Sequence, residues 1–220
     1  MKSSVPRPRG RPRSFDRDKA LLGAVRVFRE RGYDAATLAE LQEAMGGLSP
    51  PSLYAAFGSK EELFKEAVSR YLESTSQPGR CALEAPGTST RDAIEQVMRA
   101  GVAAMTKAGE PRGCMLVLGA LNCASESGDG AAASAHLHRL RLTSYRSIAD
   151  RIRRGIREGD VPRGTDVDGL TTFVTALING LSVLARDGAS RAALNAAVDR
   201  AMRAWDATSA AHKSIRARTR

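Results

Sequence analysis

The chain of 220 residues is 42% hydrophobic and carries a formal net charge of +10. This content is enough to bury a core in one large domain or two small ones. The sequence has neither an apolar run near the roughly 20 residues that span a bilayer nor an apolar signal segment after its N-terminal arginines. Its three cysteines, an odd number without metal-ligand spacing, fit a reducing cytoplasm, and no cofactor or metal is expected.

The N-terminal segment carries most of the excess positive charge. Its first 31 residues hold ten Lys and Arg and three acidic residues, which leaves a local balance of +7. Counterion release would favour its binding to DNA phosphates. Residues Pro8 to Arg13 resemble an AT-hook, an extended strand narrow enough for the minor groove of A·T-rich DNA. Arg9, Arg11 and Arg13 are therefore candidate DNA contacts, either inside the groove or as a non-specific phosphate clamp.

Two helices are predicted next, the second of them short. Their apolar positions at helical spacing are Leu21, Ala24, Val25, Phe28, Leu38, Leu41 and Met45. Gly32-Tyr33 ends the first helix, Thr37 caps the second, and Gly46-Gly47 stops it. This spacing places a tight turn directly before the following helix.

A third helix is predicted from Ser49 to Phe57. Ser49 is a side-chain N-cap, and Pro50-Pro51 occupy the first turn, where prolines cost little. Leu53 and Phe57, four residues apart, face inward and leave the other faces exposed. Ser59 caps the helix after it. A helical hairpin with a solvated face is the plain alternative to a DNA-reading unit.

The run from Ser49 to Phe64, preceded by the Thr37 helix, resembles the tetracycline-repressor (TetR) family of bacterial transcription regulators over residues 14 to 72. The resemblance implies a recognition helix at Ser49 to Phe57. Its implied DNA contacts are Thr37, Ser49, Pro50, Ser52, Tyr54, Ala55 and Lys60, with Lys60 pairing with a phosphate. The sequence departs from the family pattern in two places. The turn at Gly46-Gly47-Leu48 is one residue longer, and the small Ala55-Ala56 pair replaces larger side chains. We therefore expect few direct contacts with DNA bases.

The rest of the chain also reads as helical. A helix from Lys60 to Leu72 leaves the DNA-binding unit, and a break rich in Ser, Pro, Gly and Thr follows from Ser74 to Thr90. Further helices are expected around Ile94 to Met105 and at 113–125, 131–158, 167–186 and 191–205. The prediction is an all-α fold of about nine helices: a three-helix DNA-binding domain with the basic arm (1–60), a helical ligand-binding and dimerisation domain (61–205), and a flexible basic tail (206–220).

The resemblance, not the periodicity, implies a homodimer joined through the last two helices as a four-helix bundle. The candidate dimer residues are Phe173, Leu177, Leu181, Leu184, Leu194, Val198, Met202 and Trp205, with the small Gly180 allowing close approach. An ordinary intramolecular core is the alternative for each of them. Two recognition helices would then lie about 34 Å apart on one DNA face and read a near-palindromic operator.

The resemblance likewise implies an unidentified small-molecule effector. Its candidate contacts are Met98, Val102, Met115, Leu118, Asn122, Tyr145 and Phe173, and plain core is the alternative for most. Arg112-Gly113-Cys114 resembles an element through which some family members sense electrophiles or oxidants. A thiol in the first turn of a helix beside Arg112 would have its thiolate favoured, so Cys114 is a possible redox sensor or an inert core residue.

The sequence therefore predicts a cytoplasmic repressor that a ligand releases from its operator. A ligand-independent, weakly selective DNA-coating or architectural protein is the alternative. An enzyme is not expected, because His136 and His138 point to nearly opposite helix faces and no phosphate loop or nucleophile turn occurs.

Overall fold

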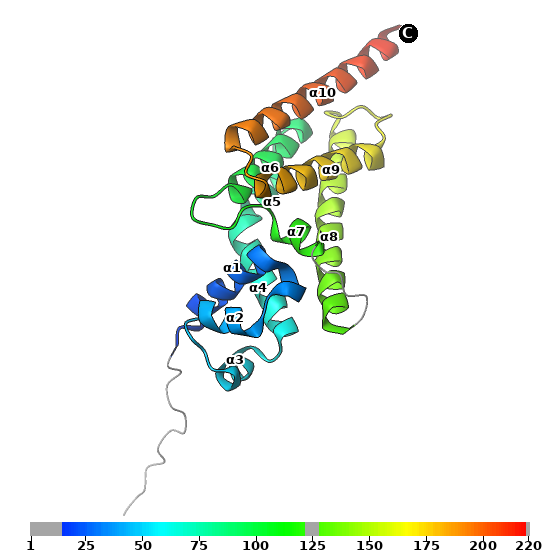
Figure 1. Ribbon diagram of the computed structural model, residues 1–220. Helices are drawn as coiled ribbons and strands as arrows, with labels where there is room; N and C mark the ends of the chain where they lie inside the picture. The colour runs from blue at the N-terminus through cyan, green and yellow to red at the C-terminus, as the bar shows by residue number, and fades with distance from the viewer. Residues whose placement is uncertain (1–14, 122–127, 219–220) are drawn as a thin grey trace, which may run out of the picture.

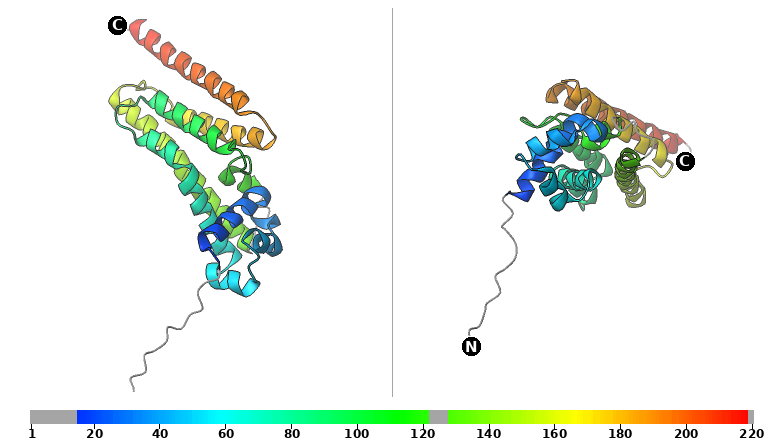
Figure 2. Two further views of the ribbon diagram at one scale, coloured as in Figure 1. Left: turned by 90° about the vertical axis from the view of Figure 1, so that its left-hand side faces the viewer. Right: turned by 60° about the horizontal axis from the view of Figure 1, so that its bottom comes forward.

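The structure is a computed structural model that describes residues 15–121 and 128–218, and its regular elements there are ten α-helices (Figure 1). The helices are α1 (Arg17–Ala35), α2 (Leu38–Ala44), α3 (Pro50–Phe57), α4 (Lys60–Thr75), α5 (Gln77–Glu84), α6 (Thr90–Met105), α7 (Met115–Leu121), α8 (Gly128–Glu158), α9 (Val167–Arg186) and α10 (Arg191–Arg218). The all-α prediction with an N-terminal three-helix unit is confirmed. The N-terminal head, α1 to α3, lies at one end of the molecule, and α9 and α10 lie at the other (Figure 2).

Helix starts follow the capping residues of the sequence. The Thr37 side chain accepts from the Glu40 amide while the Glu40 carboxylate accepts from the Thr37 amide, and Ser59 and Glu62 repeat this capping box at α4. Asp16 accepts two amide hydrogen bonds at the start of α1. These side chains pair backbone amides that the helix itself leaves free, so the boundaries of the DNA-binding unit are set locally.

Two apolar cores hold the helices together. The lower core joins α1 and α4, where Phe28, Tyr33 and Phe64 pack with ring centroids 5.0 to 6.3 Å apart. The inward stripe predicted for the first helix is buried there. The upper core joins α6, α8, α9 and the first half of α10. The 31-residue α8 contributes to both cores, so it ties the head to the upper helices.

Three elements differ from their predicted bounds. The expected break after Ser74 contains α5, because Pro78 falls in the first turn of that helix, where its missing amide hydrogen costs nothing. The predicted helix at 113–125 begins later as α7, and its last residues lie outside the described part of the chain. The basic tail expected to be flexible continues α10 as far as Arg218. The helix count therefore rises from about nine to ten within the described residues.

The head depends on a close approach of α1 to the end of α2. A Cβ atom added at Gly23 would lie 2.0 Å from the Ala44 carbonyl oxygen. Gly23→Ala should therefore destabilise the protein by about 1–3 kcal/mol, since backbone cannot move aside as a flexible side chain does. Gly101→Ala, where the added Cβ meets only the Met105 methyl at 3.5 Å, should instead be neutral or stabilising by up to about 1 kcal/mol. Urea unfolding of both variants checks this, and equal midpoints would contradict it.

Candidate nucleic-acid interface

The turn between α2 and α3 is built on two glycines in the left-handed region, with φ of 90° at Gly46 and 75° at Gly47. Only glycine adopts this conformation without steric cost. The amides of Gly47 and Leu48 both donate to the Gln42 carbonyl, and the Leu48 side chain is buried. The longer turn noted in the sequence is thus a closed, hydrogen-bonded connection that fixes where α3 begins.

Helix α3 presents one face to solvent. Leu53 and Phe57 are buried, as predicted from their spacing. The exposed residues of the helix and its cap are Ser49, Pro50, Pro51, Ser52, Tyr54 and Ala55. Tyr54 is 46% exposed, which is unusual for so large a side chain. The hydroxyls of Ser49 and Ser52 lie 2.9 Å apart. A small-residue ridge flanked by hydroxyl groups is the surface that this helix offers to a partner.

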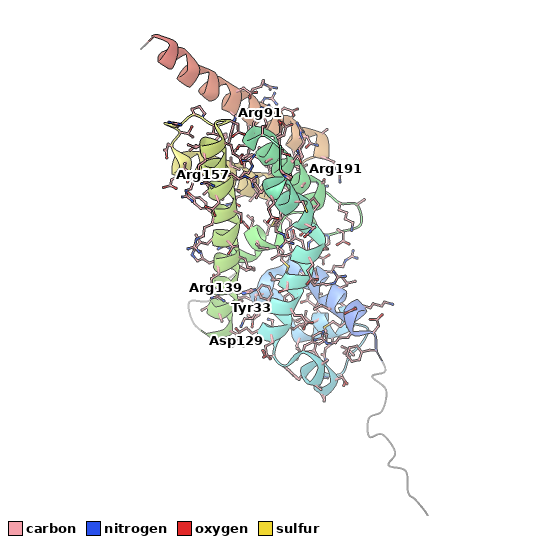
Figure 3. All side chains as sticks on the ribbon, turned by 180° about the vertical axis from the view of Figure 1, so that it is seen from behind. Tyr33, Arg91, Asp129, Arg139, Arg157 and Arg191 are labelled. Carbon is pink, nitrogen blue, oxygen red and sulfur yellow. The ribbon has the colours of Figure 1, made fainter. Side chains whose placement is uncertain are left out.

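Lys60, predicted to pair with a phosphate, is half-buried in this structure. Its ammonium lies 4.7 Å from the centroid of the Tyr33 ring. Burial lowers the Lys60 pKa, and Asp34 and Asp129 act in the opposite direction. Figure 3 shows Asp129, at the start of α8, beside Tyr33. Lys60 therefore sits between the head and α8, so its pairing with a phosphate stays a prediction.

Other candidate DNA residues differ in how freely they can reach a partner. The Thr37 hydroxyl is exposed but donates to Glu40 over 2.9 Å, so it serves the helix cap. Arg9, Arg11 and Arg13 lie outside the described residues.

The candidate effector contacts do not come together in one place. Met98 and Val102 are buried in the upper core, whereas Met115 is buried in the lower core. Phe173 is 45% exposed on α9. The Tyr145 hydroxyl, on α8, donates to the Asp168 carbonyl of α9 over 3.3 Å. Leu118 is half-buried, and Asn122 lies outside the described residues.

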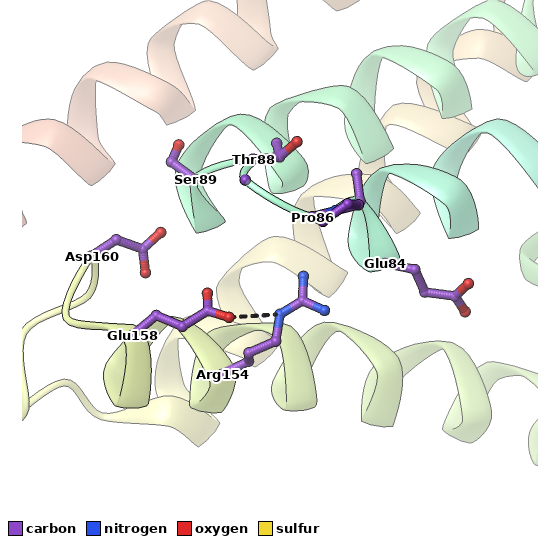
Figure 4. A pocket seen from close by; sticks show the side chains of 9 residues that line it. Glu84, Pro86, Thr88, Ser89, Arg154, Glu158 and Asp160 are labelled. Atoms are coloured by element: carbon purple, nitrogen blue, oxygen red, sulfur yellow. Dashed lines mark ion pairs between the residues drawn. The ribbon is translucent and has the colours of Figure 1, made fainter.

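A cavity of about 470 Å³ opens between the α5–α6 loop and the C-terminal end of α8 (Figure 4). Its lining includes Arg154 and three carboxylates, those of Glu84, Glu158 and Asp160. None of the residues predicted to contact an effector lines it. Its charged lining also differs from the mostly apolar walls of typical small-molecule sites.

The candidate dimer residues divide into two groups. Phe173 and Leu184 are 45% and 50% exposed, and Leu177 is half-buried. The remaining members are buried inside the upper core of the same chain: Leu181, Leu194, Val198, Met202 and Trp205. These five residues therefore belong to the core of a single chain, where α9 and α10 pack with α6 and α8.

Cys114 lies at the junction of the two cores, directly before α7. Its carbonyl accepts from the Leu118 amide over 2.9 Å, and its amide donates to the Ser182 hydroxyl of α9 over 2.8 Å. Its thiol neighbours the Tyr71 hydroxyl of α4, and burial and this neighbour raise the Tyr71 pKa. Cys114 was predicted in the first turn of a helix that begins at residue 113, whereas it lies one residue before α7.

Arg112 does not take the role at Cys114 that its neighbouring position indicated. Its guanidinium donates to the Ala185 carbonyl over 2.7 Å and to the Ala189 carbonyl, at the C-terminal end of α9. Carbonyls at the C-terminal end of a helix carry partial negative charge, so those around the end of α9 hold this guanidinium.

Arg112 is one of three arginines that link the head to α9. Their hydrogen bonds form a closed ring that joins α1, the loop before α7, and α9. Arg29 of α1 is 7% exposed and donates to the carbonyls of Pro111 and Gly113 in the loop before α7. Arg112, in that loop, binds the end of α9. Arg186, in the last turn of α9, donates hydrogen bonds to backbone carbonyls of α1.

Arg186 donates to the Arg29 carbonyl over 3.2 Å and to the Glu30 carbonyl over 2.7 Å. These carbonyls lie close to Gly32, whose φ of 79° and ψ of −173° depart from helical geometry inside α1. Sequence reasoning missed this link because arginines read as solvated charge until their acceptors, carbonyls distant along the chain, are known.

An exposed, capped helix after a tight turn, seated on a helical support, defines a helix-turn-helix DNA-binding protein. Comparison with known families agrees. The chain matches "Bacterial regulatory proteins, tetR family" over residues 20–67 and "Tetracyclin repressor-like, C-terminal domain" over residues 90–205. The chain belongs to the TetR family of transcriptional regulators. Regulators of this family bind DNA, act as dimers and are not enzymes, which confirms the corresponding predictions from the sequence.

Relatives extend over most of the chain. The transcriptional repressor ComR of Escherichia coli K12 is 32% identical over 201 residues, 91% of this chain and 94% of its own. The repressor BdcR of the same strain is 30% identical over 82% of this chain and 84% of its own. A cysteine-substituted form of the TetR family regulator CifR, solved with a 26-bp double-strand operator DNA, is 45% identical with a TM-score of 0.82, covering 89% of this chain and 99% of that one.

Lys60 gives a direct test of the interface. Lys60→Ala should weaken binding to specific and random duplexes alike and lower the slope of log affinity against log salt by about one, because one phosphate contact is lost. Lys65→Ala is the matched control, since Lys65 lies on the next turn of α4 and pairs with Glu61. Fluorescence anisotropy at several salt concentrations measures both slopes. A slope unchanged in Lys60→Ala would remove Lys60 from the contacts.

Proposed function

We propose that this protein is a homodimeric repressor that binds a near-palindromic operator through α3 and leaves it when an effector binds. The exposed face of α3, held in a capped helix-turn-helix, carries the proposal. Its support includes the likeness to CifR, which was solved with operator DNA, and to two relatives named repressors. We place DNA binding in residues 1–60, effector binding and dimerisation in 61–205, and the protein in the cytoplasm.

The proposed DNA contacts are those offered by the exposed face of α3 and its surroundings. They are Thr37, Ser49, Pro50, Ser52, Tyr54, Ala55 and Lys60, with Arg9, Arg11 and Arg13 from the basic arm. Hydroxyl groups and cations position a protein on phosphates, while base edges carry sequence information. With Ala55 exposed in the C-terminal half of the helix, apolar contact with thymine methyl groups is the base reading that this surface favours.

The dimer is proposed to form on the outer face of α9. Phe173, Leu177, Gly180 and Leu184 follow one another at spacings of four, three and four residues, so they lie along one stripe of the helix. A Cβ added at Gly180 would meet nothing within 4 Å, which leaves room for a second helix. Full burial of each exposed apolar side chain would contribute about 1.5–3 kcal/mol.

The same stripe explains a feature that the sequence analysis did not expect. Helix α9 has 20 residues, and an 18-residue window of it has a mean hydropathy of 1.5, so it is long and apolar enough to cross a membrane by length and composition alone. We assign its apolar surface to a partner subunit and not to lipid. The inner face of α9 packs against α6 and α8, so one helix serves the core and the dimer together.

Effector release is proposed to act through the arginine link between α9 and the head. Guanidinium–carbonyl contacts are short and directional, so a shift of α9 would move either α1 or the loop before α7. An effector that binds better to the shifted arrangement would change the separation of the two recognition helices and lower operator affinity. Met98, Val102, Met115, Leu118, Asn122, Tyr145 and Phe173 remain the proposed effector region, although Phe173 would take part only after a rearrangement of α9.

Cys114 supports a second route to release, in which its modification acts as the signal. The thiol neighbours Tyr71 of α4, and the Cys114 amide donates to the Ser182 hydroxyl of α9. An adduct at this sulfur would have to displace the Tyr71 hydroxyl, and α4 carries the head. The proposal is that modification of Cys114 separates α4 from α9 and releases the DNA.

The first experiment is an anisotropy titration of the purified protein against DNA flanking its own coding region, with a scrambled duplex as competitor. Tight, competitor-resistant binding with two protomers per site is the expected result, because one short recognition helix contacts too few base pairs alone. Equal affinity for both duplexes, followed by failure of a random-sequence selection to enrich any motif, would instead favour the architectural alternative with its steep salt dependence.

The dimer proposal predicts that Phe173→Glu combined with Leu184→Glu yields a folded monomer, since buried unpaired carboxylates oppose association. Sedimentation velocity measures the change, and circular dichroism checks the helix content. Leu142→Glu is the matched control, because Leu142 is 37% exposed and lies on α8 instead of α9. A double variant that stays dimeric would move the interface elsewhere.

The sensor proposal predicts that Cys114→Ser abolishes DNA release by N-ethylmaleimide. Release should persist in the Cys81→Ser and Cys123→Ser double variant, which keeps Cys114 as its remaining thiol. Mass spectrometry locates the adduct while anisotropy follows the DNA. Release of the Cys114→Ser protein at the wild-type rate would end the sensor proposal.

A further inference from the structure

Arg17, the first residue of α1, belongs by sequence to the basic N-terminal segment, where charge alone would make it a phosphate ligand. The structure gives its guanidinium three protein partners on two other helices. The Nη1 and Nη2 atoms donate to the two oxygens of the Glu66 carboxylate of α4 over 2.5 and 2.8 Å. Nη2 also donates to the Ala56 carbonyl of α3 over 3.3 Å, and the guanidinium carbon lies 4.4 Å from the centroid of the Phe57 ring.

These contacts meet a need that is specific to α3. The helix has eight residues and buries two large side chains, Leu53 and Phe57. Glycines with positive φ precede and follow it, at Gly47 and Gly58. A helix this short is not stable by itself in water, so its orientation depends on tertiary contacts. Arg17 supplies one at its C-terminal end, where a cation also interacts favourably with the free carbonyls.

Bidentate pairing with a carboxylate fixes the plane of a guanidinium. Glu66 therefore holds Arg17 against the Phe57 ring and the Ala56 carbonyl, and the hydrogen bond to Glu66 raises the Arg17 pKa. The pair is about one-third exposed, with side-chain exposures of 34% and 36%. Its positive charge is compensated within the protein, so little of it is left for a phosphate.

We infer that Arg17 and Glu66 are positioning residues for the recognition helix: they set the orientation of α3 on α1 and α4, and thereby its fit to the operator, without contacting DNA. This inference rests on the proposed role of α3. It separates Arg17 from Arg9, Arg11, Arg13 and Lys60, which are proposed to contact DNA directly.

The sharpest variant is Glu66→Gln, because it removes one negative charge and so raises the net charge of the protein by one. Electrostatics alone would strengthen binding to every duplex. Loss of the Arg17 anchor should instead weaken binding to the operator roughly tenfold or more, the scale of a charge-assisted hydrogen bond, and leave random DNA bound as well as before or slightly better. Arg17→Ala should lose a similar factor, and the double variant should lose no more than either single one, since both remove the same contact.

The probe is the duplex that wild-type protein enriches from a random library, with a scrambled duplex beside it. Arg26→Ala is the matched control, since Arg26 is exposed on α1 and pairs with Glu30 of its own helix. Arg17→Lys keeps the charge but not the bidentate geometry, so it should restore only part of the operator affinity. Salt slopes of the Arg17 and Glu66 variants should match the wild type.

Hydrogen exchange without DNA gives a readout that does not depend on binding. The amides of Leu53 and Gly58, which donate within α3, should exchange faster in Arg17→Ala and Glu66→Gln, while the amides of α9 keep their wild-type rates. Faster exchange throughout the protein would mean general destabilisation and overturn the positioning role.

Stronger operator binding by Glu66→Gln, or a salt slope reduced by about one in Arg17→Ala, would assign Arg17 to the phosphate backbone and overturn the inference. A wild-type protein that enriches no sequence would instead overturn the proposed function, and hydrogen exchange would still test the contact. The two failures are therefore distinguishable.

Discussion

The arrangement of this protein depends on guanidinium groups that bind backbone carbonyls at helix ends. Arg29, Arg112 and Arg186 join α1, the loop before α7, and α9 in a closed sequence of such contacts. Their acceptors lie in the loop before α7, around the end of α9, and in α1 beside Gly32. Arg29 is the buried one of the three, and a buried guanidinium is costly unless acceptors surround it. Through them, the DNA-binding head and the proposed dimer helix form one connected body.

Apolar packing also connects the head to the upper helices. The lower core is not confined to the head, because Met115 of the α7 region and Leu137 of α8 are buried within it. Cys114 packs against both cores. A division of the chain at residue 60 therefore follows the proposed functions, but the lower core contains residues from both sides of it. That overlap favours transmission of a change in the upper helices to α4, since close-packed interiors transmit strain.

Positive charge in the N-terminal region can attract DNA or stabilise the fold. In a count along the sequence, every arginine contributes equally to the attraction of DNA. In the structure, Arg17 is paired with Glu66 and Arg29 with carbonyls and Glu110. Their charge supports the fold of the head, while Lys60 lies over an aromatic ring beside α8. Net charge is therefore a sound argument for affinity to nucleic acid, but it does not identify which cations reach the phosphates.

Local rules place the helix-turn-helix, because its capping residues, its glycine turn and the Leu53–Phe57 spacing act within a few residues of the chain. The inward stripe of α1 also follows from the sequence. Features that depend on partners far along the chain follow only from the fold. Leu194, Val198, Met202 and Trp205 lie in the intramolecular core and Phe173 and Leu184 on the surface, although all have the same helical periodicity. Periodicity shows that a helix has an apolar face but not which element covers it, and an arginine acquires its acceptors only when the chain folds.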